Sequence, residues 1–158
     1  ARVRISHDNA SFSDVTDSSA NAFAIRPTLS VTLPVAGADL VVGTSGHTVR
    51  IVRSSATITN VKLEYSKDGG TWTSLQAGAD NVALTAGTTD YTWNNLPDAI
   101  SQNLVIRAVD TGNANIVGLS PTFHIIVALA LSSPGAVSWS VDSNQTITYT
   151  RTGSIPRP

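Results

Sequence analysis

The feature that most constrains this chain is that it repeats itself. The segment FAIRPTLSVTLP, residues 23–34, matches FHIIVALALSSP, residues 123–134, with Phe, Ile, Leu and Pro coinciding one hundred positions apart. Two further matches occur in the same order, ARVRIS with LVIRAV upstream and GHTVRI with NQTITY downstream. A period near 100 residues is too long for a solenoid and is the size of a β-sandwich module.

The repeat divides the chain into three parts. We expect residues 1–34 to be the C-terminal part of one repeat, residues 35–134 a complete repeat, and residues 135–158 the N-terminal strands of a following one. The two partial repeats would together supply first and last strands, but none that matches VKLEYS or TDYTW. If the C-terminal part of one copy combined with the N-terminal part of another, the core of the resulting sandwich would therefore be half empty. This favours the interpretation that the chain is a window onto a longer array.

The complete repeat has the alternation of half-buried β-strands. Apolar and polar residues alternate in HTVRIVR, VKLEYS, TDYTWNNL, NLVIRAVD and PTFHIIV, and turns rich in Gly, Asn, Asp and Ser separate these runs. The alternation places Val49 and Ile51 on one face, and it directs Val61, Leu63 and Tyr65 inward with Lys62 and Glu64 outward. No segment shows a convincing ten-residue helical period. The pattern predicts an all-β fold of tandem immunoglobulin-like or fibronectin type III-like sandwiches, here without the buried disulfide because the chain has no cysteine.

These strands also carry a resemblance to known proteins. VKLEYSKDGGTWTSL, YTWNNLPDAISQNLVIRAVDTGN and SPTFHI, followed by SPGAVSWSVDSNQTITYTRTGSIP, resemble the Ig-like repeats of very large secreted or cell-surface proteins. More distantly, they are similar to Ser/Thr-rich Ig-like modules of fungal wall and bacterial surface proteins. One departure is that Leu40 or Val41 stands where the next repeat has Trp139. The resemblance covers nearly the whole chain, and since it consists of core and turn positions it implies fold and location rather than an activity.

The segment LEYSKDGGTWTSL, residues 63–75, is the most motif-like stretch. The Asp-box of sialidase-like propellers needs Ser-x-Asp-x-Gly-x-Thr-Trp, but here the Thr-Trp pair comes one residue early and no second copy recurs at blade spacing. A calcium loop needs several oxygen ligands, and the segment offers one carboxylate, Asp68. Gly69 and Gly70 can take positive φ, and Asp68 can hydrogen-bond its own backbone. The segment therefore predicts a tight β-hairpin turn.

Composition excludes several classes of partner and favours one location. The net charge is −1 and 13% of residues are charged, so the basic surface that binds nucleic acid is missing. No apolar run approaches the ~18 residues of a membrane span. About a quarter of the chain is Ser or Thr, and Lys62 and Lys67 are the two lysines. This composition is typical of β-rich proteins, and we expect an extracellular or cell-surface location.

We expect no catalytic, metal or cofactor site. His7, His47 and His124 have no spacing that brings two of them onto one face, and the eleven acidic residues are scattered singly. A glycosidase needs two carboxylates facing each other across a cleft, which a small sandwich does not naturally form. The chain has no Gly-rich phosphate loop, zinc-binding helix motif or nucleophile elbow.

Four aromatic residues and two sequons are the remaining candidates. Trp72, Tyr91 and Trp93, with Tyr65, could stack on sugar rings if these side chains are exposed. Their alternation on strands favours core positions instead. Asn9 and Asn144 head the sequons Asn-Ala-Ser and Asn-Gln-Thr, which accept glycans where the cell modifies such sites.

The sequence therefore predicts a non-catalytic structural module of an extracellular surface or filament-forming protein. Its expected partners are neighbouring repeats of the same chain or copies of itself. The alternative is a carbohydrate-binding or adhesin module, with glycans as the partner.

Overall fold

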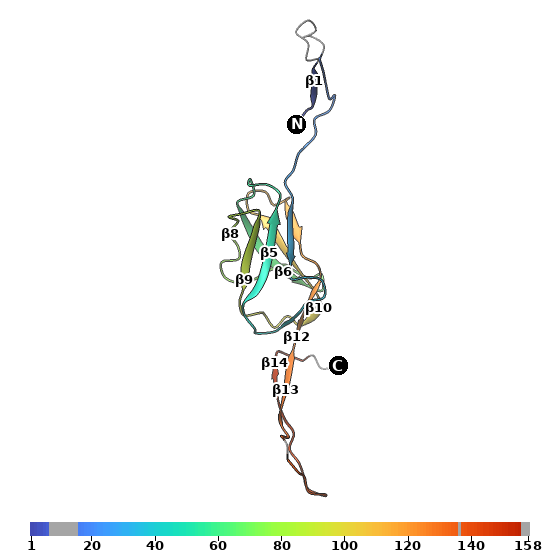
Figure 1. Ribbon diagram of the computed structural model, residues 1–158, viewed down its shortest axis with the longest axis vertical. Helices are drawn as coiled ribbons and strands as arrows, with labels where there is room; N and C mark the ends of the chain where they lie inside the picture. The colour runs from blue at the N-terminus through green and yellow to red at the C-terminus, as the bar shows by residue number, and fades with distance from the viewer. Residues whose placement is uncertain (7–15, 136, 156–158) are drawn as a thin grey trace.

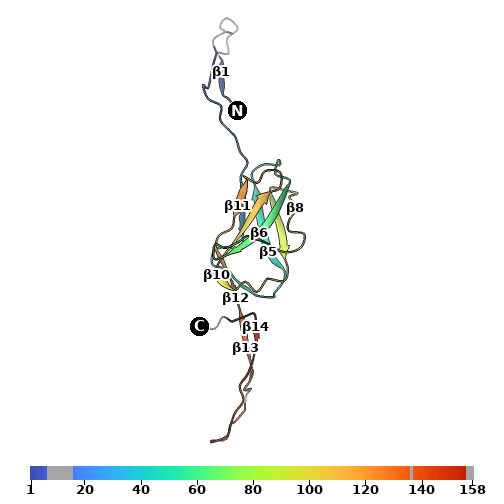
Figure 2. The same ribbon diagram turned by 180° about the vertical axis from the view of Figure 1, so that it is seen from behind.

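The computed structural model describes residues 1–6, 16–135 and 137–155, and within these ranges the secondary structure consists of strands and turns. A central sandwich occupies the middle of an elongated molecule, and a two-stranded hairpin extends from each end (Figure 1). The same arrangement is seen from behind in Figure 2. Among the described residues, no helix is long and apolar enough to cross a membrane.

The central sandwich consists of two packed sheets. The three-stranded sheet has the order β3–β5–β9, with β3 at Leu29–Leu33, β5 at His47–Arg53 and β9 at Thr88–Trp93. The larger sheet has the order β4–β12–β10–β6–β7, with β4 at Asp39–Val41, β12 at Phe123–Ile126, β10 at Ser101–Asp110, β6 at Asn60–Lys67 and β7 at Thr73–Ser74.

Two short strands complete the larger sheet: β11 at Val117–Leu119 pairs with β10, and β8 at Val82–Ala83 pairs with β6. Strand β4 runs parallel to β12, and the other pairs are antiparallel. The first strand of the sandwich is thus divided between the two sheets, as β3 and β4. This strand order defines an immunoglobulin-like sandwich, and the predicted fold class is confirmed.

Alternating residues of both sheets form the core, as the sequence predicts. Val49 and Ile51 of β5 are buried, and so are Val61 and Leu63 of β6. Strands β9, β10 and β12 contribute Trp93, Leu104, Ile106, Phe123 and Ile125, which are fully buried. Tyr65, which was also expected to point inward, is partly buried and packs against this core.

The N-terminal hairpin reproduces a hairpin of the sandwich. It consists of β1 at Arg4–Ser6 and β2 at Thr16–Ser18. Beside it, the Ser19 amide donates to the Val3 carbonyl (2.8 Å), and the Val3 amide donates to the Ser19 hydroxyl (3.3 Å). In the sandwich, Ser120 and Ile106 make the same two hydrogen bonds at 2.8 and 2.9 Å. The backbone pairing of the last two strands is therefore the same in both places.

The C-terminal hairpin reproduces the first two strands of the three-stranded sheet. It consists of β13 at Ala128–Ser133 and β14 at Thr148–Thr152. Its register shifts between Leu131 and Ser133, and the β3–β5 register shifts between Val31 and Leu33, one hundred residues earlier. The sequence repeat is thus also a repeat of strand pairing.

The predicted boundaries at residues 34 and 134 are wrong by one strand. Strand β3 pairs with β5 inside the sandwich, and β13 pairs with β14 outside it. The reason is that Leu29 and Val31 are 7% and 2% exposed, and β3 covers this apolar side only by joining the central core. The sandwich therefore extends from β3 to Ile126. The repeat in the sequence shows which positions of consecutive modules are equivalent. It does not show at which of these positions one module ends and the next begins.

Gly118 lets β11 and β3 approach closely, and this predicts a stability effect. A Cβ at Gly118 would lie 2.6 Å from the backbone of Leu29, so Gly118→Ala must separate the two strands. We expect a loss of about 1–3 kcal/mol in the free energy of unfolding, the usual cost of overpacking. Urea titration followed by tryptophan fluorescence measures it.

Gly87→Ala is the matched control. A Cβ there would have its nearest neighbour at 3.9 Å, an ordinary contact. Equal effects of the two substitutions would contradict the packing explanation.

Candidate functional site

The predicted hairpin at Ser66–Gly70 is present, with two differences in detail. Strand β6 turns back into β7, pairing Tyr65 with Thr73, and the Gly70 amide donates to the Lys67 carbonyl at 2.8 Å. Positive φ was expected at Gly69 and Gly70. It is found at Asp68 (52°) and Gly69 (72°) instead. Two consecutive residues with positive φ give a turn whose twist matches that of the strands it joins.

Asp68 bonds to a neighbouring strand instead of to its own turn. Its carboxylate accepts a hydrogen bond from the Ser101 hydroxyl at 2.6 Å, and its amide donates to the Asn103 carbonyl at 2.9 Å. The expectation of a local side-chain bond was therefore wrong, because β10 lies close enough to compete. This carboxylate fixes the turn to the sheet, which is a structural role.

The three aromatic residues considered for ligand stacking do not lie together on an exposed face. Trp93 is 0% exposed, and its indole donates to the Leu75 carbonyl at 3.0 Å. A buried ring cannot stack on a sugar, so Trp93 is removed from the candidate ligand-binding residues. Tyr91 is partly buried and its hydroxyl accepts a hydrogen bond from Gln76 at 2.9 Å. Trp72 is partly buried at the opposite sheet.

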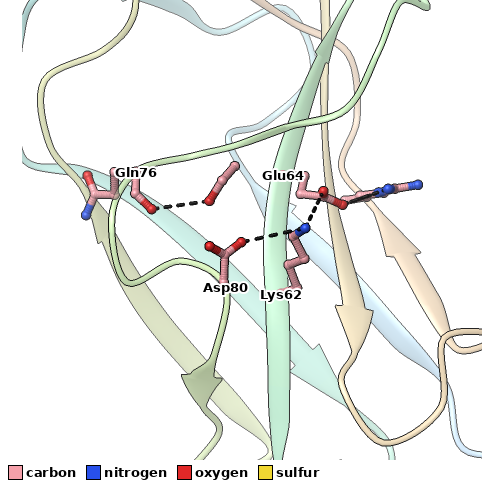
Figure 3. Close-up of polar contacts among 6 residues, drawn as sticks. Lys62, Glu64, Gln76 and Asp80 are labelled. Atoms are coloured by element: carbon pink, nitrogen blue, oxygen red, sulfur yellow. Dashed lines mark hydrogen bonds and ion pairs between the residues drawn. The ribbon is translucent and has the colours of Figure 1, made fainter.

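A group of charged side chains lies on the outer face of the larger sheet, and we call it the outer-face network. Glu64 is its centre: Oε1 lies 3.0 Å from Lys62 Nζ, and Oε2 accepts from Arg107 Nε at 2.7 Å. Lys62 also reaches Asp80 at 3.7 Å, so this ammonium group lies between two carboxylates (Figure 3). The Arg107 guanidinium lies 4.3 Å from the centre of the Trp72 ring.

The electrostatics of this network favour a structural role. Burial alone would raise the pKa of Glu64, but the hydrogen bonds from Lys62 and Arg107 outweigh it and hold the pKa below its usual value. Hydrogen bonding to Glu64 raises the pKa of Lys62 in turn. A general acid near neutral pH needs a raised carboxyl pKa. The network therefore keeps Glu64 ionised and joins β6 to β10.

Sequence reasoning placed Glu64 on the outward side of β6 and missed that it is buried there. Its side chain is 7% exposed because Lys62 and Arg107 cover it. The signal was present in part: Lys62 and Glu64 are two residues apart and so share one face of the strand. Arg107 is 43 positions away, and only the pairing of β6 with β10 brings it opposite Glu64.

The histidines and sequons are separate from this network. His47 Nε2 lies 2.7 Å from the Thr44 hydroxyl, and His124 Nδ1 lies 2.7 Å from an Asp39 carboxylate oxygen. Within residues 1–6, 16–135 and 137–155, no three His, Asp or Glu side chains are grouped so as to hold a metal ion. His7 and the sequon residue Asn9 lie outside the described residues. Asn144 is exposed in the segment between β13 and β14.

The strand order defines the class as an Ig-like β-sandwich protein. No protein-family model matches the chain, and no curated protein matches it. Among solved structures the chain is similar to one described as "Crystal structure of the titin domains z1z2 in complex with telethonin". The identity is 12% and the TM-score 0.36, over 70% of this chain and 55% of that chain. This chain thus spans about half the length of the titin chain it matches.

Glu64 gives a pH-dependent prediction. Since its folded-state pKa lies below the unfolded value near 4.5, its contribution to stability is present above about pH 4.5 and is lost as pH falls through the folded pKa. Glu64→Gln should cost about 1–3 kcal/mol at pH 7, because two cations lose a buried charged partner. The difference from the unsubstituted chain should shrink at pH 3. Urea titrations at both pH values measure it.

Asp90→Asn is the control, since it breaks an exposed pair with Arg50. Its effect at pH 7 should be much smaller than that of Glu64→Gln. A Glu64→Gln effect that does not change with pH would contradict the ion-pair explanation.

Proposed function

We propose that this chain is a non-catalytic structural repeat module of an extracellular surface or filament-forming protein, and that it acts as a rigid spacer and assembly unit. The observation that carries the proposal is the repeated strand pairing. The hairpins at the two ends of the molecule have the pairing of the last two and first two strands of the sandwich between them. In a tandem array of sandwiches, the same strand pairing would recur before and after each sandwich.

The exposed apolar residues of the two hairpins support the same proposal. In the N-terminal segment, Val3 and Phe23 are 52% and 43% exposed, whereas the equivalent Ile106 and Phe123 of the sandwich are fully buried. The C-terminal hairpin also exposes core-equivalent residues, namely Leu129, Leu131, Ile147 and Tyr149. A two-stranded hairpin alone is marginally stable in water, so these apolar sides need covering strands. Neighbouring repeats of the same kind would supply them.

A sandwich suits a spacer because apolar packing between its two sheets forms its core. The core is continuous between the two sheets, and the chain enters and leaves at opposite ends (Figure 1). The extracellular assignment is supported by the Ser/Thr-rich, lysine-poor composition and by the resemblance of the strand sequences to surface repeats. Asn144 is exposed and so open to glycosylation.

The alternative function, a carbohydrate-binding or adhesin module, now has weaker support. It depends on Trp72 and Tyr91. Tyr91 is on β9 of the three-stranded sheet, whereas Trp72 directly precedes β7 of the larger sheet and is stacked against Arg107. If the chain binds to a glycan array and the Trp72→Ala variant does not, this alternative would be favoured over the spacer.

The test of the proposed function is the mass and shape of the native chain. We expect an intact denatured mass far above 16.5 kDa, and strings of regularly spaced beads or a regular fibre in electron micrographs of the same sample. A native chain of 16.5 kDa that stays a monodisperse monomer would contradict the array.

A further inference from the structure

One end of the sandwich already holds part of the C-terminal hairpin through a carboxylate. Asp98 lies between β9 and β10, and it accepts hydrogen bonds from the Ser154 amide at 3.1 Å and from the Ser154 hydroxyl at 2.5 Å. These bonds hold the pKa of Asp98 below its usual value, with Lys67 and Arg151 contributing at longer range. A carboxylate that accepts bonds from both groups of one residue fixes the position of that residue.

Apolar packing surrounds this carboxylate contact. A Cβ placed on Gly153 would lie 2.5 Å from a Val42 methyl carbon, 3.2 Å from Ile100 and 3.3 Å from Val127. Gly153 also has a φ of +95°, which disfavours other residues. The turn after β14 therefore fits closely against a surface that we call the distal pole, formed by Val42, Asp98, Ile100 and Val127.

The other end of the sandwich has the counterpart of that turn. Arg53 pairs with Leu29 as Arg151 pairs with Leu129, so Ser55 takes the place of Gly153. Pro27 takes the place of Val127, four residues after the equivalent phenylalanines. Here a hollow of about 270 Å³ is lined by Ile25, Arg26, Pro27, Ser54, Ser55 and Thr57. At the distal pole, Val42 and Ile100 fill the corresponding space beside Gly153.

We infer that this hollow is the docking surface for the distal pole of a preceding Ig-like sandwich, one that presents a carboxylate flanked by aliphatic side chains. The inference rests on the proposed function, because it requires sandwiches in tandem. Hydrogen bonding fits this partner, because the hydroxyl-bearing Ser54, Ser55 and Thr57 line the hollow. Docking at both ends fixes the angle between consecutive sandwiches and makes the array stiff.

The occupied junction is tested first, in the chain as it is. Asp98→Asn weakens the bonds to Ser154, so the backbone of β13 and β14 should become more mobile than the sandwich in ¹⁵N relaxation. Asp90→Asn, in an exposed pair on β9, is the matched control and should leave that mobility unchanged. Equal, rigid tumbling of hairpin and sandwich in both variants would overturn the role of Asp98.

The empty hollow is tested with a tandem chain in which residues 1–122 are followed by residues 23–158. This junction keeps Phe and Ile at the two buried positions of the last strand, because Phe23 and Ile25 replace Phe123 and Ile125. It also places the first distal pole beside the second sandwich's hollow. We expect both sandwiches to share one rotational correlation time.

Charge exchange at this junction makes the test specific. Asp98→Arg in the first sandwich, or Ala56→Asp at the position in the second sandwich that is equivalent to Ser154, should let the two sandwiches tumble independently. The double variant should restore shared tumbling. Independent tumbling of the unsubstituted tandem chain, with both sandwiches folded by tryptophan fluorescence, would overturn the docking surface. It would leave the array itself intact, since a flexible array still gives a heavy native chain.

Discussion

The two sheets of this sandwich are joined by burial around one tryptophan, because the chain has no cysteine to cross-link them. Trp93 is on β9 of the three-stranded sheet, and its ring packs edge-to-face on Phe123 of β12 at 6.4 Å between centres. It also lies 5.7 Å from the ring of Tyr65 on β6. Its one polar group bonds to the Leu75 carbonyl, so the ring is buried without an unpaired donor.

This packing determines what can happen at the surface. Since β6 and β10 direct alternate residues to the core, the residues between them must face outward, and there Glu64 meets Arg107. The outer-face network is thus a consequence of the core register. A shift of one residue would place charged side chains in the core and apolar ones outside. The buried carboxylate therefore penalises the same register errors as the apolar core does.

The fold could be predicted from the sequence because strand alternation is local. Val49, Ile51, Val61 and Leu63 were assigned to the core from alternation alone, and all four are buried. The SKDGG turn was predicted for the same reason. Its details were not, because the Asp68 partners, Ser101 and Asn103, lie in β10, more than thirty positions away.

Module boundaries and the candidate sites could not be predicted in the same way. Strand β3 has the same apolar–polar alternation whichever module it joins. Only its pairing with β5 shows to which module it belongs. Trp93 and Trp72 are both strand or turn aromatics in sequence, yet one is fully buried and the other lies under Arg107. The Asp98 contact with Ser154 joins residues 56 positions apart across two modules, and no local pattern records it.

The junction residues differ between the two ends of the sandwich, and this difference bears on the shape of an array. At the distal pole the contacting turn carries Gly153, whose missing Cβ allows the approach of Val42. At the other end the equivalent residue is Ser55, whose side chain occupies space that Gly153 leaves free, while Arg26 stands at the position that corresponds to Ile126 at the end of β12. The cores of consecutive modules can remain alike while such small substitutions change how closely the ends approach. In a tandem array the angle at each junction would then be encoded by these few turn residues, separately from the residues that encode the fold.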